Sequence, residues 1–223
     1  MGGVRVDSDS QMSNVPGLFA AGECAAGING ANRLGGNSLS DLLVFGKRAG
    51  EYAAQFAKNN ARVGIDQAEL KRAVDDAVKP FERQASTENP YAVQSALQDM
   101  MQSLVGIVRT ETEMQQALGD LRTLNARASQ ATVTGHREYN PGWHTAIDLQ
   151  NLLTVSEAIT RSAIERKESR GGHFREDFPD KAQEFGTINI VTAKSTDGTM
   201  AVRRVPIPPM PPELKQIIED QQK

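Results

Sequence analysis

The sequence has few of the residues that mark secreted or membrane-spanning proteins. Cys24 is its only cysteine, so no disulfide can form within the chain, and a reducing compartment is the simplest inference. No apolar run approaches the roughly 18–20 residues of a membrane-spanning helix, and no signal-peptide pattern is found. We therefore expect no direct insertion into a membrane.

Excess charge and metal ligands are also lacking. The net charge is −3 at pH 7 and the pI about 5.7, which does not indicate nucleic acid as a partner. The three histidines, His136, His144 and His173, are not at metal-ligand spacing, so we expect no metal site and a structural role for His173. No base is spaced to activate Cys24, which is expected to be a small buried residue.

Glycine, in contrast, is abundant near the start of the chain. A glycine-rich segment, residues 22–39, follows the apolar run Leu18–Ala21 and leads into an apolar-periodic segment from Leu39 to Phe56. The pattern predicts a strand, a loop and a helix capped by Ser38, with small residues that let the helix pack closely against a sheet. A further half-buried strand is predicted at residues 4–6.

This predicted corner has the chemistry of a binding site. The N-terminus of a helix presents free N–H groups and a positive dipole end, which suit an electron-rich or anionic group. One cation, Arg33, lies in the loop beside the polar side chains of Asn32, Asn37 and Ser38. We interpret the corner as holding a cofactor edge and a carboxylate substrate together.

Helical periodicity dominates from about residue 63. Helix starts are predicted at Asp66, Asn89, Thr110 and Asn140, two of them followed by proline. Pro80 is expected to break or kink the first of these helices. The last helix is expected to bury one face through Trp143, Ile147, Leu152, Val155, Ile159 and Ala163. Short loops between antiparallel helices indicate a small bundle.

The remainder of the chain is different again. Residues 169–179 are charged and predict a flexible loop. Asp197-Gly198 predicts a hairpin between strands at 188–192 and 200–205, and five prolines then predict an extended run before a short terminal helix. The fold class is therefore α+β, with a partial strand-loop-helix corner, an antiparallel bundle of three to four helices, a β-hairpin and a proline-rich tail. We expect domain limits at 1–62, 63–166 and 167–223.

Several motifs resemble the flavoprotein subunit of succinate dehydrogenase and fumarate reductase. Two blocks carry the resemblance most specifically: Pro16-Gly17-Leu18-Phe19-Ala20-Ala21-Gly22-Glu23 with Gly30-Ala31-Asn32-Arg33-Leu34-Gly35-Gly36-Asn37-Ser38-Leu39, and Glu168-Ser169-Arg170-Gly171-Gly172-His173-Phe174-Arg175-Glu176-Asp177-Phe178-Pro179. The opening Met1-Gly2-Gly3-Val4 is similar to the end of the family's His-x-x-Met-Gly-Gly motif, whose histidine would lie upstream. The resemblance implies a C-terminal part of that subunit, with the dinucleotide fingerprint and the capping domain absent. Such a fragment is expected to be inactive alone.

The resemblance also implies roles for individual residues. Arg33 would hold a carboxylate of succinate or fumarate against FAD, since a planar, permanently charged fork matches a carboxylate at two points. Glu23 would accept bonds from the FAD ribose hydroxyls, and Asn37, Ser38 and Leu39 would meet the cofactor at the helix start. The plainer interpretations are a structural arginine, a solvated carboxylate and a simple helix cap. Asn29 departs from the family, which usually has histidine there.

The expected function is thus FAD-dependent interconversion of succinate and fumarate. Electrons would pass to an iron–sulfur subunit and on to a quinone, with membrane anchor subunits holding the complex on the cytoplasmic side of the inner membrane. Two alternatives stay open: an L-aspartate oxidase-like flavoprotein, and a non-catalytic helical interaction module. Gly35-Gly36, where L-aspartate oxidases typically have Ala-Ser, and the long tail favour the dehydrogenase.

Overall fold

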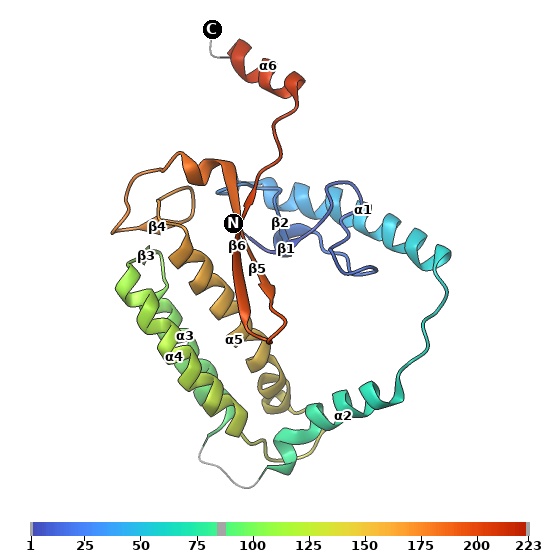
Figure 1. Cartoon of the computed structure of the whole chain (residues 1–223). Coiled ribbons are helices and arrows are strands. Elements are labelled where there is room, and N and C mark those ends of the chain that lie inside the picture. The colour runs from blue at the N-terminus through green and yellow to red at the C-terminus, as the bar shows by residue number, and fades with distance from the viewer. Residues whose placement is uncertain (1, 84–87, 222–223) are drawn as a thin grey trace.

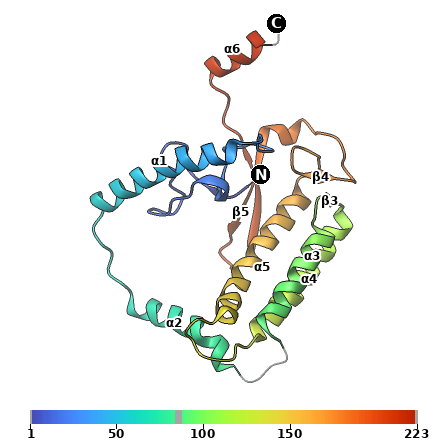
Figure 2. The same ribbon diagram turned by 180° about the vertical axis from the view of Figure 1, so that it is seen from behind.

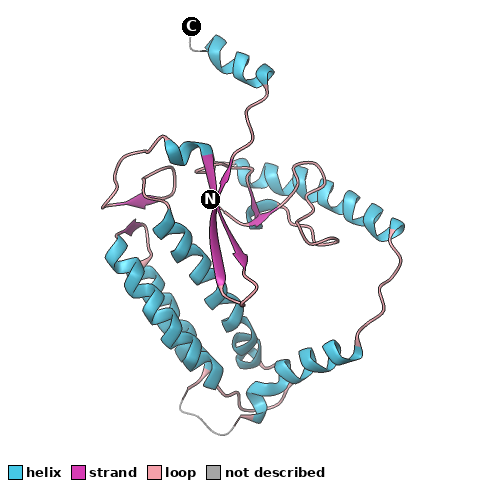
Figure 3. Cartoon of the chain, in the orientation of Figure 1, coloured by secondary structure: helices cyan, strands magenta, loops and turns pink. Residues whose placement is uncertain are grey.

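The computed structural model describes residues 2–83 and 88–221 and mixes helices with short two-stranded sheets, which confirms the α+β class (Figures 1 and 3). The helices are α1 (Asn37–Asn59), α2 (Gln67–Glu82), α3 (Pro90–Leu104), α4 (Glu111–Gln130), α5 (Pro141–Glu165) and α6 (Pro212–Gln221). The strands are β1 (Val4–Arg5), β2 (Ala25–Ala26), β3 (Val108–Arg109), β4 (Phe174–Arg175), β5 (Ile188–Lys194) and β6 (Met200–Pro206). The expected domain limits remain a prediction.

The N-terminal segment contains less strand than predicted. β1 pairs in parallel with β2, whereas Leu18–Ala21 forms no ladder and contributes one isolated bridge, Met12 to Phe19. The reason is local: the Ala20 amide donates to the Gln11 carbonyl at 3.0 Å, and the Ser13 amide donates to the Leu18 carbonyl at 2.7 Å. These bonds tie the segment to residues 11–13 instead of to a longer strand, and a 3-10 turn, η1 (Gly22–Cys24), follows it.

Helix α1 is present, but Ser38 does not cap it. The helix begins at Asn37, its N-cap is Gly36 in a left-handed conformation (φ 86°), and no side chain caps it. The predicted cap is therefore wrong, because a glycine turn closed by a bond from the Asn37 amide to the Leu34 carbonyl leads the chain into the helix. The expected close packing on a sheet is also wrong, since no residue of α1 is buried.

The contacts of α1 are instead with the segment that precedes it. The Phe56 ring lies edge-on to Phe19 with the ring centroids 6.2 Å apart. Nearer the start of the helix, the space that a Cβ on Gly22 would take is occupied by Leu42, whose Cδ2 atom lies 2.5 Å from that point. The absence of a side chain at Gly22 thus lets η1 lie directly on α1.

The predicted helix starts of the bundle are confirmed. The side chains of Asp66, Asn89, Thr110 and Asn140 each accept a bond from a first-turn amide of the helix that follows. These local caps satisfy amides that a helix cannot pair internally. Pro80 does not break α2 where it stands, because it lies in the last turn, and the helix ends two residues later at Glu82.

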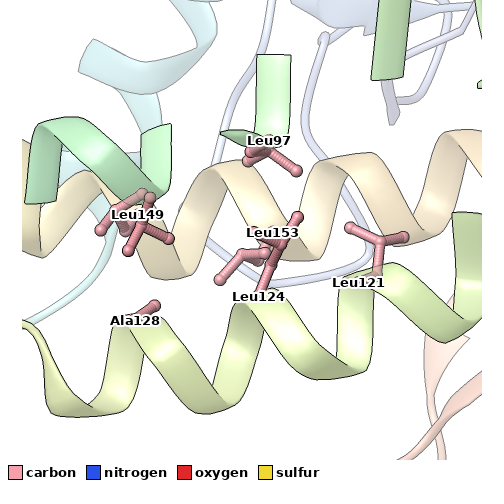
Figure 4. Close-up of a cluster of buried hydrophobic side chains, with 7 residues drawn as sticks. Leu97, Leu121, Leu124, Ala128, Leu149 and Leu153 are labelled. Carbon is pink, nitrogen blue, oxygen red and sulfur yellow. The ribbon is translucent and has the colours of Figure 1, made fainter. Parts of the chain in front are cut away.

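Helices α3, α4 and α5 enclose the core. Figure 4 shows leucines from all three helices pointing toward one another. The buried cluster consists of Val93, Leu97, Leu121, Leu124, Ala128, Leu149 and Leu153. The face predicted for α5 is wrong at four positions: Ile147, Leu152, Val155 and Ile159 are exposed, while Leu149, Leu153, Ser156, Thr160 and Ala163 are buried.

The C-terminal hairpin is confirmed and runs beside α5 (Figures 1 and 2). β5 and β6 pair in antiparallel register from Ile188 with Pro206 to Lys194 with Met200. An ion pair of 2.6 Å between Arg204 and Glu165 links the hairpin to the end of α5. The terminal helix α6 stands apart from the rest of the chain at the end of an extended segment, residues 207–211 (Figures 1 and 2).

Candidate functional site

The residues predicted to form the site lie within one stretch of chain, residues 23–39, that leads into α1. Glu23 is in η1, Arg33 is in the loop after β2, and Asn37, Ser38 and Leu39 form the first turn of the helix. Because η1 contacts α1, the structure brings the turn that carries Glu23 against the helix whose first turn carries the other three. Ser38 is half-buried and the other four are exposed. Their binding roles stay predictions.

The start of α1 is suited to an electron-rich group. No side chain caps the helix, so first-turn amides are free to bind a ligand, and the positive end of the helix dipole lies there. Space is also left open in front of the loop, since a Cβ on Gly27, Gly30, Gly35 or Gly36 would meet no atom within 4 Å. An uncapped helix start behind a bare glycine loop fits the edge of a flat cofactor such as a flavin.

Arg33 differs from the paired arginines of the loop after α5, such as Arg170 and Arg175. Its side chain is exposed, and within residues 2–83 and 88–221 no carboxylate forms an ion pair with it. Its amide donates to the Asn32 side-chain oxygen at 2.9 Å, which shapes the loop but leaves the guanidinium unused. A guanidinium with two donors in one plane remains available for a carboxylate.

The segment 169–179, predicted to be a flexible charged loop, is instead tied down by ion pairs of the buried residues Glu168 and Arg175. The Glu168 side chain is completely buried between two arginines: its Oε1 lies 2.6 Å from Arg166 and 2.8 Å from Arg170. The Ala182 amide donates to its other oxygen at 2.9 Å. Burial alone would raise the pKa of Glu168, but these bonds lower it to about 2. The expectation of flexibility is therefore wrong.

Arg175 is the second buried charge of this loop and is completely enclosed. Its guanidinium donates to both oxygens of Asp177 at 2.7 Å and to Glu111 at 3.0 Å. It also donates to the Ala163 carbonyl at 2.9 Å near the end of α5. One residue thus joins α4, α5 and the loop, and its bonds lower the pKa of Asp177 to about 2.

His173 has the structural role that the sequence analysis expected. Its Nδ1 atom lies 3.0 Å from an Arg109 nitrogen, which can only donate, and its Nε2 atom lies 3.0 Å from the Arg166 carbonyl, which can only accept. The ring is therefore neutral, with its proton on Nε2. Burial lowers the pKa of His173, and the cationic neighbours Arg109 and Arg175 lower it further.

The loop held by these charges rests on the predicted site. The Gly172 amide donates to the Ala31 carbonyl at 3.0 Å, two residues before Arg33. A Cβ on Gly171, where φ is +60°, would lie 2.3 Å from that same oxygen. Sequence reasoning missed this contact. The available signal was the adjacent glycine pair inside an otherwise charged segment, which indicates close backbone approach.

Cys24 is exposed, which corrects the expectation of a buried thiol. It lies in η1, and its Sγ atom is 3.3 Å from the Ala21 carbonyl.

Among residues 2–83 and 88–221, no group of histidine, cysteine or acidic side chains could hold a metal ion. The described helices include none both long and apolar enough to cross a bilayer.

Known proteins similar to this chain point to one family. Residues 94–217 match the family described as fumarate reductase flavoprotein C-term, and residues 1–39 match the FAD binding domain. The fumarate reductase flavoprotein subunit of Mycobacterium tuberculosis is 36% identical over 93% of this chain and 37% of its own length. The fumarate reductase flavoprotein subunit of Haemophilus influenzae is 38% identical over 81% of this chain and 31% of its own length.

A solved structure agrees with these relatives. Mycobacterium smegmatis Sdh1, determined in complex with UQ1, is 44% identical and superimposes with a TM-score of 0.90, covering 97% of this chain and 37% of the solved chain. The present chain therefore spans about a third of the length of the relatives that it matches. More than half of its residues fall within the C-terminal family match. The chain belongs to the fumarate reductase and succinate dehydrogenase flavoprotein family.

Proposed function

We propose that the chain is part of an FAD-dependent flavoprotein subunit that interconverts succinate and fumarate, and that Arg33 binds a carboxylate of the substrate. The observation that supports this most directly is the exposed guanidinium of Arg33, which pairs with no carboxylate in the described part of the chain and lies beside a helix start without a side-chain cap. A dicarboxylate held there would have one end fixed by two parallel bonds, and fixing the reacting carbon in place is a large part of catalysis.

The cofactor in this proposal is FAD, which, when bound, supplies the acceptor or donor of the hydride. Backbone amides at Ser38 and Leu39 would meet its electron-rich edge, and the helix dipole there would favour added negative charge. Glu23, on the turn that lies against α1, would accept bonds from the two neighbouring ribose hydroxyls. Asn37 would contribute its side-chain amide to the same cofactor.

The proposed partners follow from the same assignment. Electrons would pass to an iron–sulfur subunit and then to a quinone, in keeping with the relative that was solved with UQ1. Membrane anchor subunits would hold the complex on the cytoplasmic side of the inner membrane. Because the chain corresponds to about a third of its relatives, we expect the 223-residue chain alone to bind FAD poorly and to lack activity.

The test is succinate-dependent dye reduction by the FAD-loaded flavoprotein that contains this chain. We expect reduction of dichlorophenolindophenol with succinate and none with L-aspartate. Reduction with L-aspartate instead would favour the L-aspartate oxidase alternative. If neither substrate reduces the dye while FAD is bound, the proposed function is wrong and the helical interaction module becomes the better interpretation.

A further inference from the structure

We infer that the glycine pair Gly171–Gly172 is a positioning element for Arg33, through which the helical bundle sets the place of the substrate-binding loop. The inference deepens the proposed function and rests on it, because Arg33 is the proposed carboxylate ligand. Gly171 and Gly172 themselves would touch neither substrate nor cofactor. Their effect would pass through Ala31, whose carbonyl receives the Gly172 amide at 3.0 Å.

The contact is close because neither residue has a side chain. At Gly171 an added Cβ would lie 2.3 Å from the Ala31 oxygen, 2.5 Å from its carbonyl carbon and 2.8 Å from its Cβ. Atoms of a backbone cannot move aside as the end of a flexible side chain can. The two chain segments therefore meet backbone to backbone, and any residue larger than glycine at position 171 must shift one segment away from the other.

The glycine pair is itself held in a defined place. It forms the tip of a tight turn in which the Arg170 amide donates to the His173 carbonyl at 2.8 Å and the His173 amide donates back at 3.1 Å. The His173 ring is fixed by Arg109 and by the Arg166 carbonyl. The strand pairing of Val108 with Phe174 continues the attachment into the segment between α3 and α4.

A rigid support on one side and an exposed loop on the other suggest the direction of the effect. Residues 27–36 have no side chain that is nine-tenths buried, and space lies open in front of four of their glycines. The hydrogen bond from the Gly172 amide to the Ala31 carbonyl joins the backbone of this loop to the C-terminal half of the described chain. A displacement of Ala31 would therefore move Arg33, and an ångström of misplacement is costly for a two-point carboxylate contact.

The chain offers two matched controls for the obvious variant, Gly171→Ala. Gly172→Ala adds the same methyl group one residue later, where the nearest atoms would be 3.9 Å away and the amide donor is kept. Gly198→Ala strains a left-handed glycine (φ +85°) in the β5–β6 hairpin without meeting any atom within 4 Å. Gly172→Ala tests whether any added methyl group at this turn has the effect. Gly198→Ala tests whether strain of a left-handed glycine is enough without a steric clash.

Two measurements on the FAD-loaded flavoprotein test the inference. In hydrogen exchange, Gly171→Ala should speed exchange of peptides within residues 27–36 by about tenfold while leaving α3 and α4 unchanged. In calorimetric titration with malonate, a non-reacting dicarboxylate, the same variant should weaken binding by about tenfold with FAD content unchanged. Gly172→Ala and Gly198→Ala should stay within about twofold of the parent in both measurements.

The outcomes are separable. Unchanged exchange and unchanged malonate affinity in Gly171→Ala would overturn the inference, as would equal effects of Gly171→Ala and Gly172→Ala. If the parent protein does not bind malonate at all, the proposed function fails, and the exchange result alone then decides whether the glycine pair holds the loop. Should Gly171→Ala fail to fold, His173→Ala loosens the same turn without a clash, and the same two shifts are expected from it.

Discussion

Arg175 and Asp177 form a two-point ion pair in which both nitrogen–oxygen distances are 2.7 Å and the guanidinium is fully enclosed. The pair spans only two residues of sequence, yet the same guanidinium reaches Glu111 on α4 and the Ala163 carbonyl on α5. This arrangement converts a charged segment into the support for the Arg33 loop. The contribution of Arg175 to the free energy of unfolding can be measured directly.

Replacing Arg175 with methionine keeps most of the side-chain volume but leaves two carboxylates without their partner. We expect the free energy of unfolding to fall by about 3 kcal/mol, because the fully enclosed guanidinium bonds Asp177, Glu111 and the Ala163 carbonyl, and all of these bonds are lost together. Urea denaturation gives the value. Arg161→Met is the matched control on α5: its pair with Glu157 is partly exposed, and we expect a loss below about 1 kcal/mol. Equal losses in the two variants would contradict the buried role of Arg175.

The same loop predicts how stability changes with pH. His173 is neutral in the fold and its pKa lies below the ordinary value of 6.5, so its contribution is complete above that pH and is lost as pH falls. The pKa values of Glu168 and Asp177 are lowered from 4.5 and 3.8 to about 2, so their contributions are lost only at more acidic pH, on the way down to about 2. The urea concentration at the midpoint of unfolding, measured from pH 8 to pH 3, should therefore decrease in two steps: first below about pH 6.5, and again at acidic pH as Glu168 and Asp177 gain protons.

The His173→Gln variant separates the windows, because glutamine cannot gain a proton. The decline that begins near pH 6.5 should be reduced in the variant, while the acidic decline persists. An identical pH profile in the parent and in His173→Gln would show that the half-buried imidazole does not contribute to this pH dependence.

Helix α5 provides a comparison between two leucines three residues apart. Leu149 is completely buried in the cluster with α3 and α4, whereas Leu152 is 37% exposed. Leu149→Ala should cost about 2–5 kcal/mol through lost burial and the cavity left behind. Leu152→Ala should cost much less, because its side chain already contacts water. Thermal unfolding of the two variants makes the comparison, and a larger effect at Leu152 would refute the observed orientation of α5.

These leucines also show where sequence reasoning succeeds and where it fails. The starts of α2 to α5 could be predicted because a cap is a local contact within three residues. The buried face of α5 could not, because it includes Ser156 and Thr160. The Thr160 hydroxyl donates to the Ser156 carbonyl at 2.8 Å, so the helix satisfies its own buried polar group, and apolar residues are left on the outside.

The candidate site also has one part that the sequence predicts and one part that it does not. The glycine-rich loop and its cation could be predicted from adjacent residues. The support beneath them could not, because the Glu111–Arg175 pair spans 64 residues and the Gly172–Ala31 bond joins opposite parts of the chain. A run of charges has the same appearance in sequence whether it is solvated or paired inside a fold, and only the tertiary contacts distinguish the two.

The substrate role of Arg33 can be tested by one measurement: succinate turnover per bound FAD in Arg33→Ala of the loaded flavoprotein. Arg62→Ala, an exposed arginine between α1 and α2, serves as the charge-matched control. We expect Arg33→Ala to lose about 100-fold or more of its turnover with FAD content nearly unchanged, and Arg62→Ala to match the parent. Normal turnover in Arg33→Ala would remove this residue from the site and contradict the proposed function of the loop.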